Sequence, residues 1–402
     1  MAYRAGVAFG SYDNVNLVSE PTEQEFSQSL NAGVRVFEDS SSLYANFDAN
    51  FSTFNYKNDI AADRNYGQLL ANIIWRIKPG NFEWIFDNNF TQSVIDPLES
   101  NSPANRQNIN VVSTGPNYII RLNPRNNIQM EVRAENYSFE ESEDNNRVAS
   151  AVRWLHNVNT ALMVSLNNEN EIARFKSGPE DLDFNRNDLF LGINYSRGLN
   201  VIFAEYGVSS VKNENINDIS SDRYFLSITN TRTQTSSIEL DYENYLSNTG
   251  NQVRGLVPDD GGDAPPIDSV ANDVFVNEQF RLQYNESINN GVIRFNASTG
   301  TRRYERFTDL DIDVDGLGIN ALWYMHRNSS FILDARYLQT DYVDPGSGRS
   351  DEDRIYSLEY RYRIKRNISV SILTSSLERI STIEDRSYED VRIFLSFNYF
   401  SI

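Results

Sequence analysis

The chain has 402 residues, a formal net charge of −20 and no cysteine. The missing thiols exclude disulfides, cysteine-ligated zinc and thiol catalysis, and the acidic balance argues against a nucleic-acid-binding surface, which would be basic. The 23 Phe, 22 Tyr and 4 Trp residues are too many for a disordered chain. No apolar run reaches the roughly 18 residues that a membrane-spanning helix needs.

Alternation of apolar and polar residues with a period of two recurs from one end of the chain to the other. In residues 43–51 every odd position is Leu, Ala or Phe, whereas the even positions are Tyr, Asn and Asp. Residues 128–135 and 356–363 alternate in the same way. Segments of this kind, roughly 10 to 16 residues long, are typical of strands that cross a bilayer with one face toward lipid and one toward water.

The predicted strands follow one another along the whole chain, and helical periodicity is nearly absent. In chain order, the segments begin near residues 3, 26, 41, 66, 82, 109, 127, 147, 161, 187, 199, 223, 236, 274, 292, 309, 330, 354, 368 and 388.

The connections between these segments alternate in length. Short turns are predicted at 38–41, 78–81, 123–126, 156–159, 196–199, 231–235, 285–291, 326–329 and 364–367. The longer polar loops include 13–25, 95–107, 176–186, 247–273 and 341–353. Outer-membrane barrels have this rhythm, with short periplasmic turns and long extracellular loops.

The pattern predicts an all-β fold: a transmembrane, antiparallel up-and-down β-barrel of about 20 strands (18–20) that forms a single domain over residues 1–402. An even number of strands would leave both termini on the periplasmic side of the outer membrane of a Gram-negative bacterium. We expect no plug domain before the first strand. The sequence also lacks a signal peptide, which suggests the mature form of the protein.

The tryptophans mark one edge of this barrel. Trp75 and Trp84 flank the turn at 78–81, Trp154 precedes the turn at 156–159, and Trp323 precedes the turn at 326–329. Because the indole ring prefers a membrane interface, we interpret these four residues as an aromatic girdle on the periplasmic side.

Charge is also separated along the barrel axis. Acidic residues gather in the long loops: Glu140, Glu141, Glu143, Asp144, Glu180, Asp181, Asp183, Asp259, Asp260, Asp263, Asp351, Glu352 and Asp353. Basic residues favour the short turns: Lys78, Arg125, Arg197, Arg327, Lys365 and Arg366. An acidic outer rim would recruit divalent cations that bridge it to outer-membrane lipid, lipopolysaccharide or an anionic polymer.

The sequence LDIDVDG (310–316) resembles the start of a calcium-binding EF-hand loop, with Asp311, Asp313 and Asp315 at alternate positions. The twelfth position of such a loop is Leu322, which cannot supply the required carboxylate. The apolar parity also switches near residue 316, which suggests a β-bulge. We therefore expect a strand whose aspartates line the inner face near the mouth, with weak calcium binding as an alternative.

Polar residues of inward parity would form the wall of the lumen. The candidate lumen-lining residues are Glu131, Arg133, Arg153, Glu239, Asp241, Glu243, Arg281, Arg294, Arg302, Asp334, Arg336, Glu359 and Arg361. Each of them alone is readily explained as part of a salt-bridged wall, but as a set they describe a hydrophilic conduit suited to sugar hydroxyls. The long loop at 247–273 is the candidate constriction of this conduit.

Catalysis has little support in the sequence. The two histidines, His156 and His326, both fall at predicted turns, and the many Asp and Glu residues single out no catalytic pair. We therefore expect no enzymatic activity and no cofactor.

Three short stretches resemble the β-barrel porin family encoded beside exopolysaccharide and PEP-CTERM (exosortase) loci: 12–20, 113–122 and 186–198. The final segment, 391–400, is similar to the aromatic C-terminal signal of outer-membrane proteins. The resemblance implies a barrel that exports a polysaccharide or assists its secretion, with a periplasmic partner from the export apparatus. A general diffusion porin for small solutes and a structural or adhesive barrel remain the alternatives.

Overall fold

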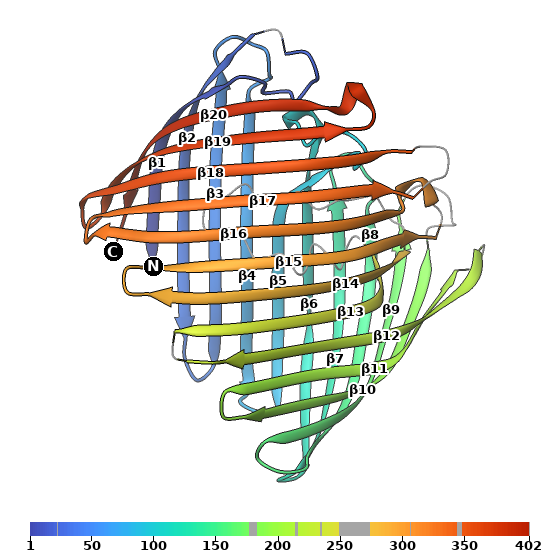
Figure 1. Ribbon diagram of the computed structural model, residues 1–402. Helices are drawn as coiled ribbons and strands as arrows, with labels where there is room; N and C mark the ends of the chain where they lie inside the picture. Colours follow the sequence, from blue (N-terminus) through green and yellow to red (C-terminus); the bar gives the residue numbers. More distant parts are fainter. Residues whose placement is uncertain are drawn as a thin grey trace.

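The computed structural model describes residues 1–21, 23–176, 183–213, 216–233, 235–248, 274–305, 307–343 and 348–401. These residues form twenty antiparallel strands in one sheet (Figure 1). The first strand pairs with both the second and the last, from Arg4 opposite Phe400 to Tyr12 opposite Arg392, so the sheet closes on itself. The predicted barrel of about 20 strands is confirmed.

The strands are β1 (Ala2–Tyr12), β2 (Glu25–Asp39), β3 (Leu43–Tyr56), β4 (Arg64–Lys78), β5 (Phe82–Val94), β6 (Arg106–Asn123), β7 (Asn126–Phe139), β8 (Asn145–Asn157), β9 (Leu162–Phe175), β10 (Phe184–Arg197), β11 (Asn200–Asn213), β12 (Ile216–Thr231), β13 (Ser236–Asn248), β14 (Val274–Ile288), β15 (Gly291–Tyr304), β16 (Ile312–His326), β17 (Ser329–Tyr342), β18 (Ser350–Lys365), β19 (Ile368–Ser381) and β20 (Tyr388–Phe400). The single-turn helices are η1 (Pro103–Asn105), η3 (Thr308–Leu310) and η4 (Glu384–Arg386). None of the helices in the described ranges is long and apolar enough to cross a membrane.

The outer face of the barrel is apolar where the strands approach the short turns. Phe47, for example, lies opposite Val36 on β2 and Ala71 on β4, and all three have the outward parity. Leu191 and Leu317 are 58% and 61% exposed on the same face. Apolar side chains at such exposure are stable only against lipid, because exposing apolar surface to water costs a free energy of roughly 25 cal/mol for each Å².

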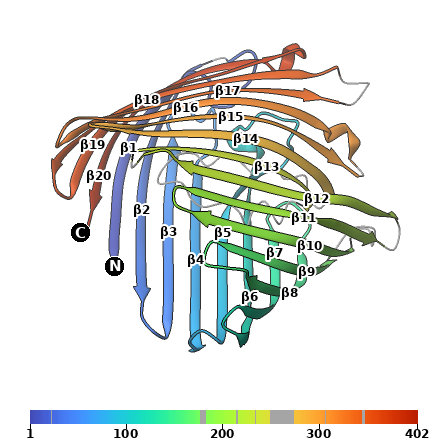
Figure 2. The same ribbon diagram turned by 60° about the horizontal axis from the view of Figure 1, so that its bottom comes forward.

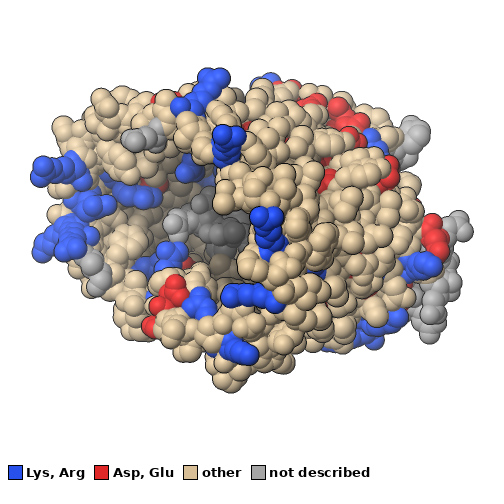
Figure 3. Space-filling model, turned by 90° about the horizontal axis from the view of Figure 1, so that it is seen from below, with Lys and Arg blue, Asp and Glu red and all other residues tan. Residues whose placement is uncertain are grey.

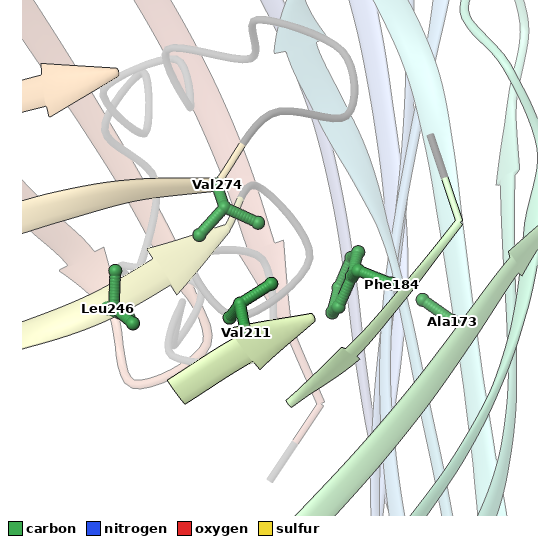
Figure 4. Packing of buried hydrophobic residues seen from close by; sticks show 5 residues of the cluster. All are labelled: Ala173, Phe184, Val211, Leu246 and Val274. Atoms are coloured by element: carbon green, nitrogen blue, oxygen red, sulfur yellow. The ribbon is translucent and has the colours of Figure 1, made fainter. Parts of the chain in front are cut away.

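Toward the long-loop ends the apolar side of each strand changes from the outer to the inner face. On β7 the outward residues Met130 and Val132 are followed by outward Asn136, while Tyr137 and Phe139 point inward and are buried. Several clusters form at these ends. One joins Ala173, Phe184 and Val211, which have the inward parity, to Leu246 and Val274, which have the outward parity of β13 and β14 (Figure 4). These strand ends therefore protrude beyond the lipid, and most of their buried apolar side chains pack inside the barrel.

This change of side corrects the interpretation of LDIDVDG. Residues 312–323 of β16 pair with β15 and β17 without a register shift, so the expected bulge near residue 316 is absent from this described stretch. Ile312 and Val314 point into the barrel, opposite Arg302 and Gly300. The expectation that Asp313 and Asp315 line the inner face was wrong, because they lie on the outer face with Trp323.

The start of β12 is the largest departure from the predicted strand boundaries. The strand was expected near residue 223 but begins at Ile216. Residues 216–222, INDISSD, contain only two apolar residues. The alternation therefore fails there, although the backbone still pairs with β11 beyond the apolar band.

Closure of an even number of described strands puts the two termini and the short turns at one edge and the long loops at the other (Figure 1). We predict that the short-turn edge is periplasmic. A cysteine at Arg327 should then resist a membrane-impermeant thiol reagent on intact cells, whereas a cysteine at Glu141 should react. The chain has no native cysteine to interfere. Reaction at 327 with protection at 141 would reverse the orientation.

Phe47 and its neighbour Asn46 test the assignment of faces. Phe47→Arg places a charge against lipid and should lower the free energy of unfolding in vesicles by about 2–4 kcal/mol, because a cation near the bilayer midplane is poorly solvated. Asn46→Arg, one residue away on the inner face, is the matched control and should change it much less. Urea titrations of both variants measure the difference, and equal effects would contradict the face assignment.

Candidate functional site: the charged inner wall and a strap across the lumen

All the sequence-predicted lumen residues lie on the inner face of the barrel by strand register. Residues that lie directly opposite each other on neighbouring strands point to the same face. Glu243 lies opposite Gln279, Arg281 opposite Ser298, and Arg302 opposite Ile312. The inward set is Glu131, Arg133, Arg153, Glu239, Asp241, Glu243, Arg281, Arg294, Arg302, Asp334, Arg336, Glu359 and Arg361.

A chain of ion pairs crosses the inner wall from β7 to β9. The Arg153 guanidinium on β8 lies 2.9 Å from a Glu131 carboxylate oxygen on β7 and 2.7 Å from a Glu169 oxygen on β9. Arg133 on β7 extends the network to β6, where it donates to the Asn117 amide oxygen at 2.5 Å. Each cation thus connects neighbouring strands through side chains as well as through the backbone.

A second network, which the sequence did not single out, continues the wall across β10 to β12. The buried Asp188 carboxylate lies 2.6 Å from Arg186 on its own strand and 3.2 Å from Arg223 on β12. Arg223 also contacts Glu205 on β11 at 2.8 Å, and its guanidinium lies over the Phe190 ring. The available signal was an Arg and an Asp two residues apart, which places both on the same face of a strand.

This spacing of two residues recurs around the barrel. Arg336 donates to Asp334 at 2.7 Å on β17, and Arg361 donates to Glu359 at 3.0 Å on β18. On β13, by contrast, the acidic residues Glu239, Asp241 and Glu243 face the amides and arginine of β14, and Glu243 accepts from the Asn277 amide at 3.2 Å. The wall carries both signs of charge in close alternation.

The cations in these networks are all arginines. Only 5 of the 36 basic residues in the chain are lysines. They are Lys57, Lys78, Lys176, Lys212 and Lys365, and each lies in a connection or near a strand end. A planar guanidinium can bind two carboxylates in a fixed geometry, which a flexible ammonium group cannot do. The inner wall is therefore stiff as well as charged.

The mouth of the barrel is visible in space-filling view. The face seen from below, on which the turns between β2 and β3 and between β4 and β5 lie, is hollowed, and Lys and Arg side chains predominate around the hollow (Figures 2 and 3). The inner-wall residues Arg4 and Arg35 near this end share the carboxylate of Asp48.

The connection between β5 and β6, residues 95–105, crosses the lumen and contacts the opposite wall (Figure 2). We call this segment the strap. The carbonyl oxygen of Leu98 accepts hydrogen bonds from Arg349 at 2.8 Å and from Arg386 at 3.1 Å. Arg386 also forms an ion pair with Glu99. The Leu98 side chain packs against the inner cluster of Phe275, Tyr304 and Leu310.

The strap also has internal hydrogen bonds that hold its shape. Asn105 accepts from the Asp96 amide at 2.8 Å and donates to the Asp96 carbonyl at 2.7 Å. The Asp96 carboxylate caps the Leu98 amide at 2.9 Å. These bonds close the base of the strap, so that Leu98 is presented at its tip.

The sequence predicted a constriction at another loop, and that prediction is not tested by the described residues. The predicted constriction at 247–273 lies outside the described residues apart from 247 and 248. The strap could not be predicted from the sequence, because its partners Arg349 and Arg386 are 251 and 288 residues from Leu98.

The tryptophans all lie at the short-turn edge of the outer face, at three places around the ring. Trp75 and Trp84 pair directly across β4 and β5, and Trp154 and Trp323 occupy equivalent positions on β8 and β16. Their exposed fractions range from 40% for Trp154 to 57% for Trp75. Such half-exposed indoles at the edge of an apolar band suit a membrane interface.

The candidate calcium ligands do not converge on a common point. Asp311 accepts from the Tyr304 amide at 2.7 Å, and Asp313 pairs with Arg303 on the outer face. Asp315 points outward, opposite Thr299. Within the described part of the chain, no group of three or more His, Asp or Glu residues is arranged to hold a metal ion.

Neither histidine belongs to a catalytic arrangement in the described residues. His156 Nδ1 lies 2.9 Å from the Asn126 amide oxygen, and its ring stacks on Trp154 at the outer edge. His326 is exposed at the end of β16.

No family model and no curated protein matches this chain. Similar solved structures are those of the ferric enterobactin receptor PfeA. A mutant of the receptor from Pseudomonas aeruginosa is 8% identical, with a TM-score of 0.51 over 99% of this chain and 80% of the receptor. The receptor in complex with BCV-L6 gives 8% identity and 0.51 over 99% and 81%. At this identity the likeness establishes the fold alone, a closed β-barrel of the kind that these outer-membrane receptors have.

Arg153 allows a test of the charge balance of the wall. Arg153→Gln leaves Glu131 and Glu169 without their shared cation, so the lumen should become more attractive to cations. The reversal potential of the barrel in a potassium chloride gradient should shift toward cation selectivity. Arg174→Gln on the outward parity of β9 removes the same charge and should leave the potential unchanged. A shift of the same size in both variants would show that Arg153 does not face the ion path.

Proposed function

We propose that the chain is a passive channel of the outer membrane for small hydrophilic solutes. The observation that carries the proposal is the inner wall, where charged and amide side chains follow one another across the strands while the outer face is apolar. A wall of this kind offers water and solutes continuous hydrogen-bonding partners through the membrane.

The close alternation of sign suits neutral solutes. Arg153 lies between two carboxylates, and Asp188 lies between two guanidinium groups. Their fields cancel within a few ångströms, so the wall lacks the single-sign field that concentrates one type of ion. Hydroxyl-rich solutes can exchange hydrogen bonds along such a wall without a strong trap.

The strap sets the size limit in this proposal. Twenty tilted strands give a backbone diameter of roughly 40 Å, and the lumen would be on the order of 20 Å wide if it were unobstructed. A segment held on both sides of that lumen divides the opening and restricts passage to small solutes.

Export of an exopolysaccharide is the second candidate function. It is suggested by the resemblance of residues 12–20, 113–122 and 186–198 to the porin family of exopolysaccharide loci. Passage of a polymer would require the strap to leave the lumen, whereas passage of small solutes would not. We therefore place the small-solute channel first.

Release of the strap tests the channel directly. Arg349→Ala combined with Arg386→Ala removes both donors to the Leu98 carbonyl and the partner of Glu99. The barrel should remain folded, because the strands keep their backbone pairing. Single-channel conductance in planar bilayers should rise and become more variable.

Arg354→Ala is the matched control, since Arg354 lies on the outer face of β18 and pairs with Glu352 and Glu378 instead of the strap. Its conductance should equal that of the parent. Absence of any conductance in the folded parent would exclude the channel, and equal conductance in released and parent barrels would exclude the strap as its constriction.

A further inference from the structure

A recess opens in the inner wall beside the tip of the strap. It lies between Leu98 and the inner faces of β14 to β19 and has a volume of about 220 Å³. Gly300 on β15 lines the recess at an inward position, and its missing side chain leaves the wall hollow there. Gly316 on β16 is a second inward glycine, which lies beside Ser298 and Leu338, two residues of the lining.

The recess has an apolar side and a polar side. Val314 and Leu338 supply aliphatic surface, and Leu338 is 38% exposed although it points into the barrel. Gln279 and Thr340 supply an amide and a hydroxyl group at the same level. Val314 and Leu338 together give the recess an apolar side within an otherwise polar wall.

A paired charge borders the polar side. The Arg379 guanidinium lies 2.7 Å and 2.8 Å from the two carboxylate oxygens of Asp353, and Arg379 is 3.7 Å from Asp351. Two of the donors on Arg379 are therefore already used. The pair can still accept and donate hydrogen bonds at its edge, but its opposite charges compensate each other.

We propose that this recess is a binding subsite for one ring of a neutral sugar. A pyranose has an aliphatic C–H face and a rim of hydroxyl groups that both donate and accept, which matches the aliphatic surface and the mixed amide, hydroxyl and ion-pair rim. The proposal rests on the proposed channel and deepens it, because it names carbohydrate as the solute class and places its stopping point at the strap.

The size and charge of the recess argue against other ligands. Sites for drug-sized molecules have volumes of roughly 300–1,000 Å³, so this recess holds a single small unit. A free anion such as phosphate would compete with Asp353 for Arg379 and meet the carboxylate. The amide and the ion pair form hydrogen bonds with water when the recess is open. A purely apolar ligand would remove that water and offer no hydrogen bond in its place.

The experiment fills the recess without changing its charge. A Cβ at Gly316 would lie 2.8 Å from the Ser298 hydroxyl oxygen, which can rotate away, and 3.5 Å from Leu338 Cδ1. Gly316→Val therefore adds two methyl groups against Ser298 and Leu338, so that they narrow the recess these two residues line, on a strand that favours β-branched residues. Ser375→Val on the inner face of β19 is the matched control, because Ser375 does not line the recess. Gln279→Ala removes one polar partner and leaves the volume open.

Binding is measured by saturation-transfer NMR on the detergent-solubilised barrel with glucose, galactose and glucuronate as probes, and folding by the thermal shift of the barrel in gels. We expect saturable binding of glucose or galactose to the parent and to Ser375→Val, and affinity about tenfold weaker in Gly316→Val and in Gln279→Ala, the size of one lost hydrogen-bonding contact. Stronger binding of glucuronate than of the neutral sugars would overturn the neutral-sugar assignment.

The outcome of the sugar-binding experiment can be distinguished from the outcome of the conductance experiment on the channel. Conductance without saturable binding of any probe would overturn the subsite and leave the channel standing, as would binding that Gly316→Val does not weaken. Saturable binding that the variants weaken, in a barrel without conductance, would support the subsite and exclude the channel.

Discussion

Closure of the sheet is the constraint on which the rest of the structure depends. Lipid offers no hydrogen-bonding partner, so each backbone N–H and C=O in the membrane must pair with another strand. An open sheet would leave two unpaired edges, and the pairing of β1 with β20 removes them. Once the backbone is fully paired, side chains can vary freely on either face provided that they keep the alternation.

Each strand passes through two environments, the bilayer and the water beyond it. This explains why the apolar residues move from the outer to the inner face near the long loops. Within the bilayer the outer face must be apolar and the inner face can be wet. Beyond the bilayer the outer face is wet, and apolar residues are stable only if they turn inward and pack. The inner clusters near Tyr137 and Phe275 follow from this change, and the cluster at Phe275 in turn supplies the surface on which Leu98 of the strap packs.

The inner wall shows how charges can line a conduit without attracting only one ion. A carboxylate or guanidinium removed from bulk water is costly unless partners compensate it. Arginines placed between acids on neighbouring strands provide this compensation, and they also hold the strands together through side chains. The charges of the wall therefore compensate each other at the scale of a small solute, and in the proposed channel the strap rather than the wall limits what fits.

The amino-acid sequence by itself determined the approximate number of strands, their two faces within the apolar band and the edge marked by tryptophan. Period-two alternation is a local property, and it decides the direction of Phe47 or Arg153 as soon as a strand forms. The alternation of turn lengths is equally local, so the up-and-down order could be predicted with it. Where the alternation weakened, at residues 216–222, the predicted boundary was late by seven residues.

Only the tertiary structure decided which side chains meet across the barrel. Strand parity places Arg186 and Arg223 inward but does not show that they share Asp188, because that contact depends on the stagger of three strands. The aspartates of LDIDVDG were assigned to the wrong face, since the sequence shows a change of parity but not where the lipid ends. The strap depends on contacts between Leu98 and residues more than 250 positions away. A local pattern carries no information about such contacts, because they exist only when the ring is closed.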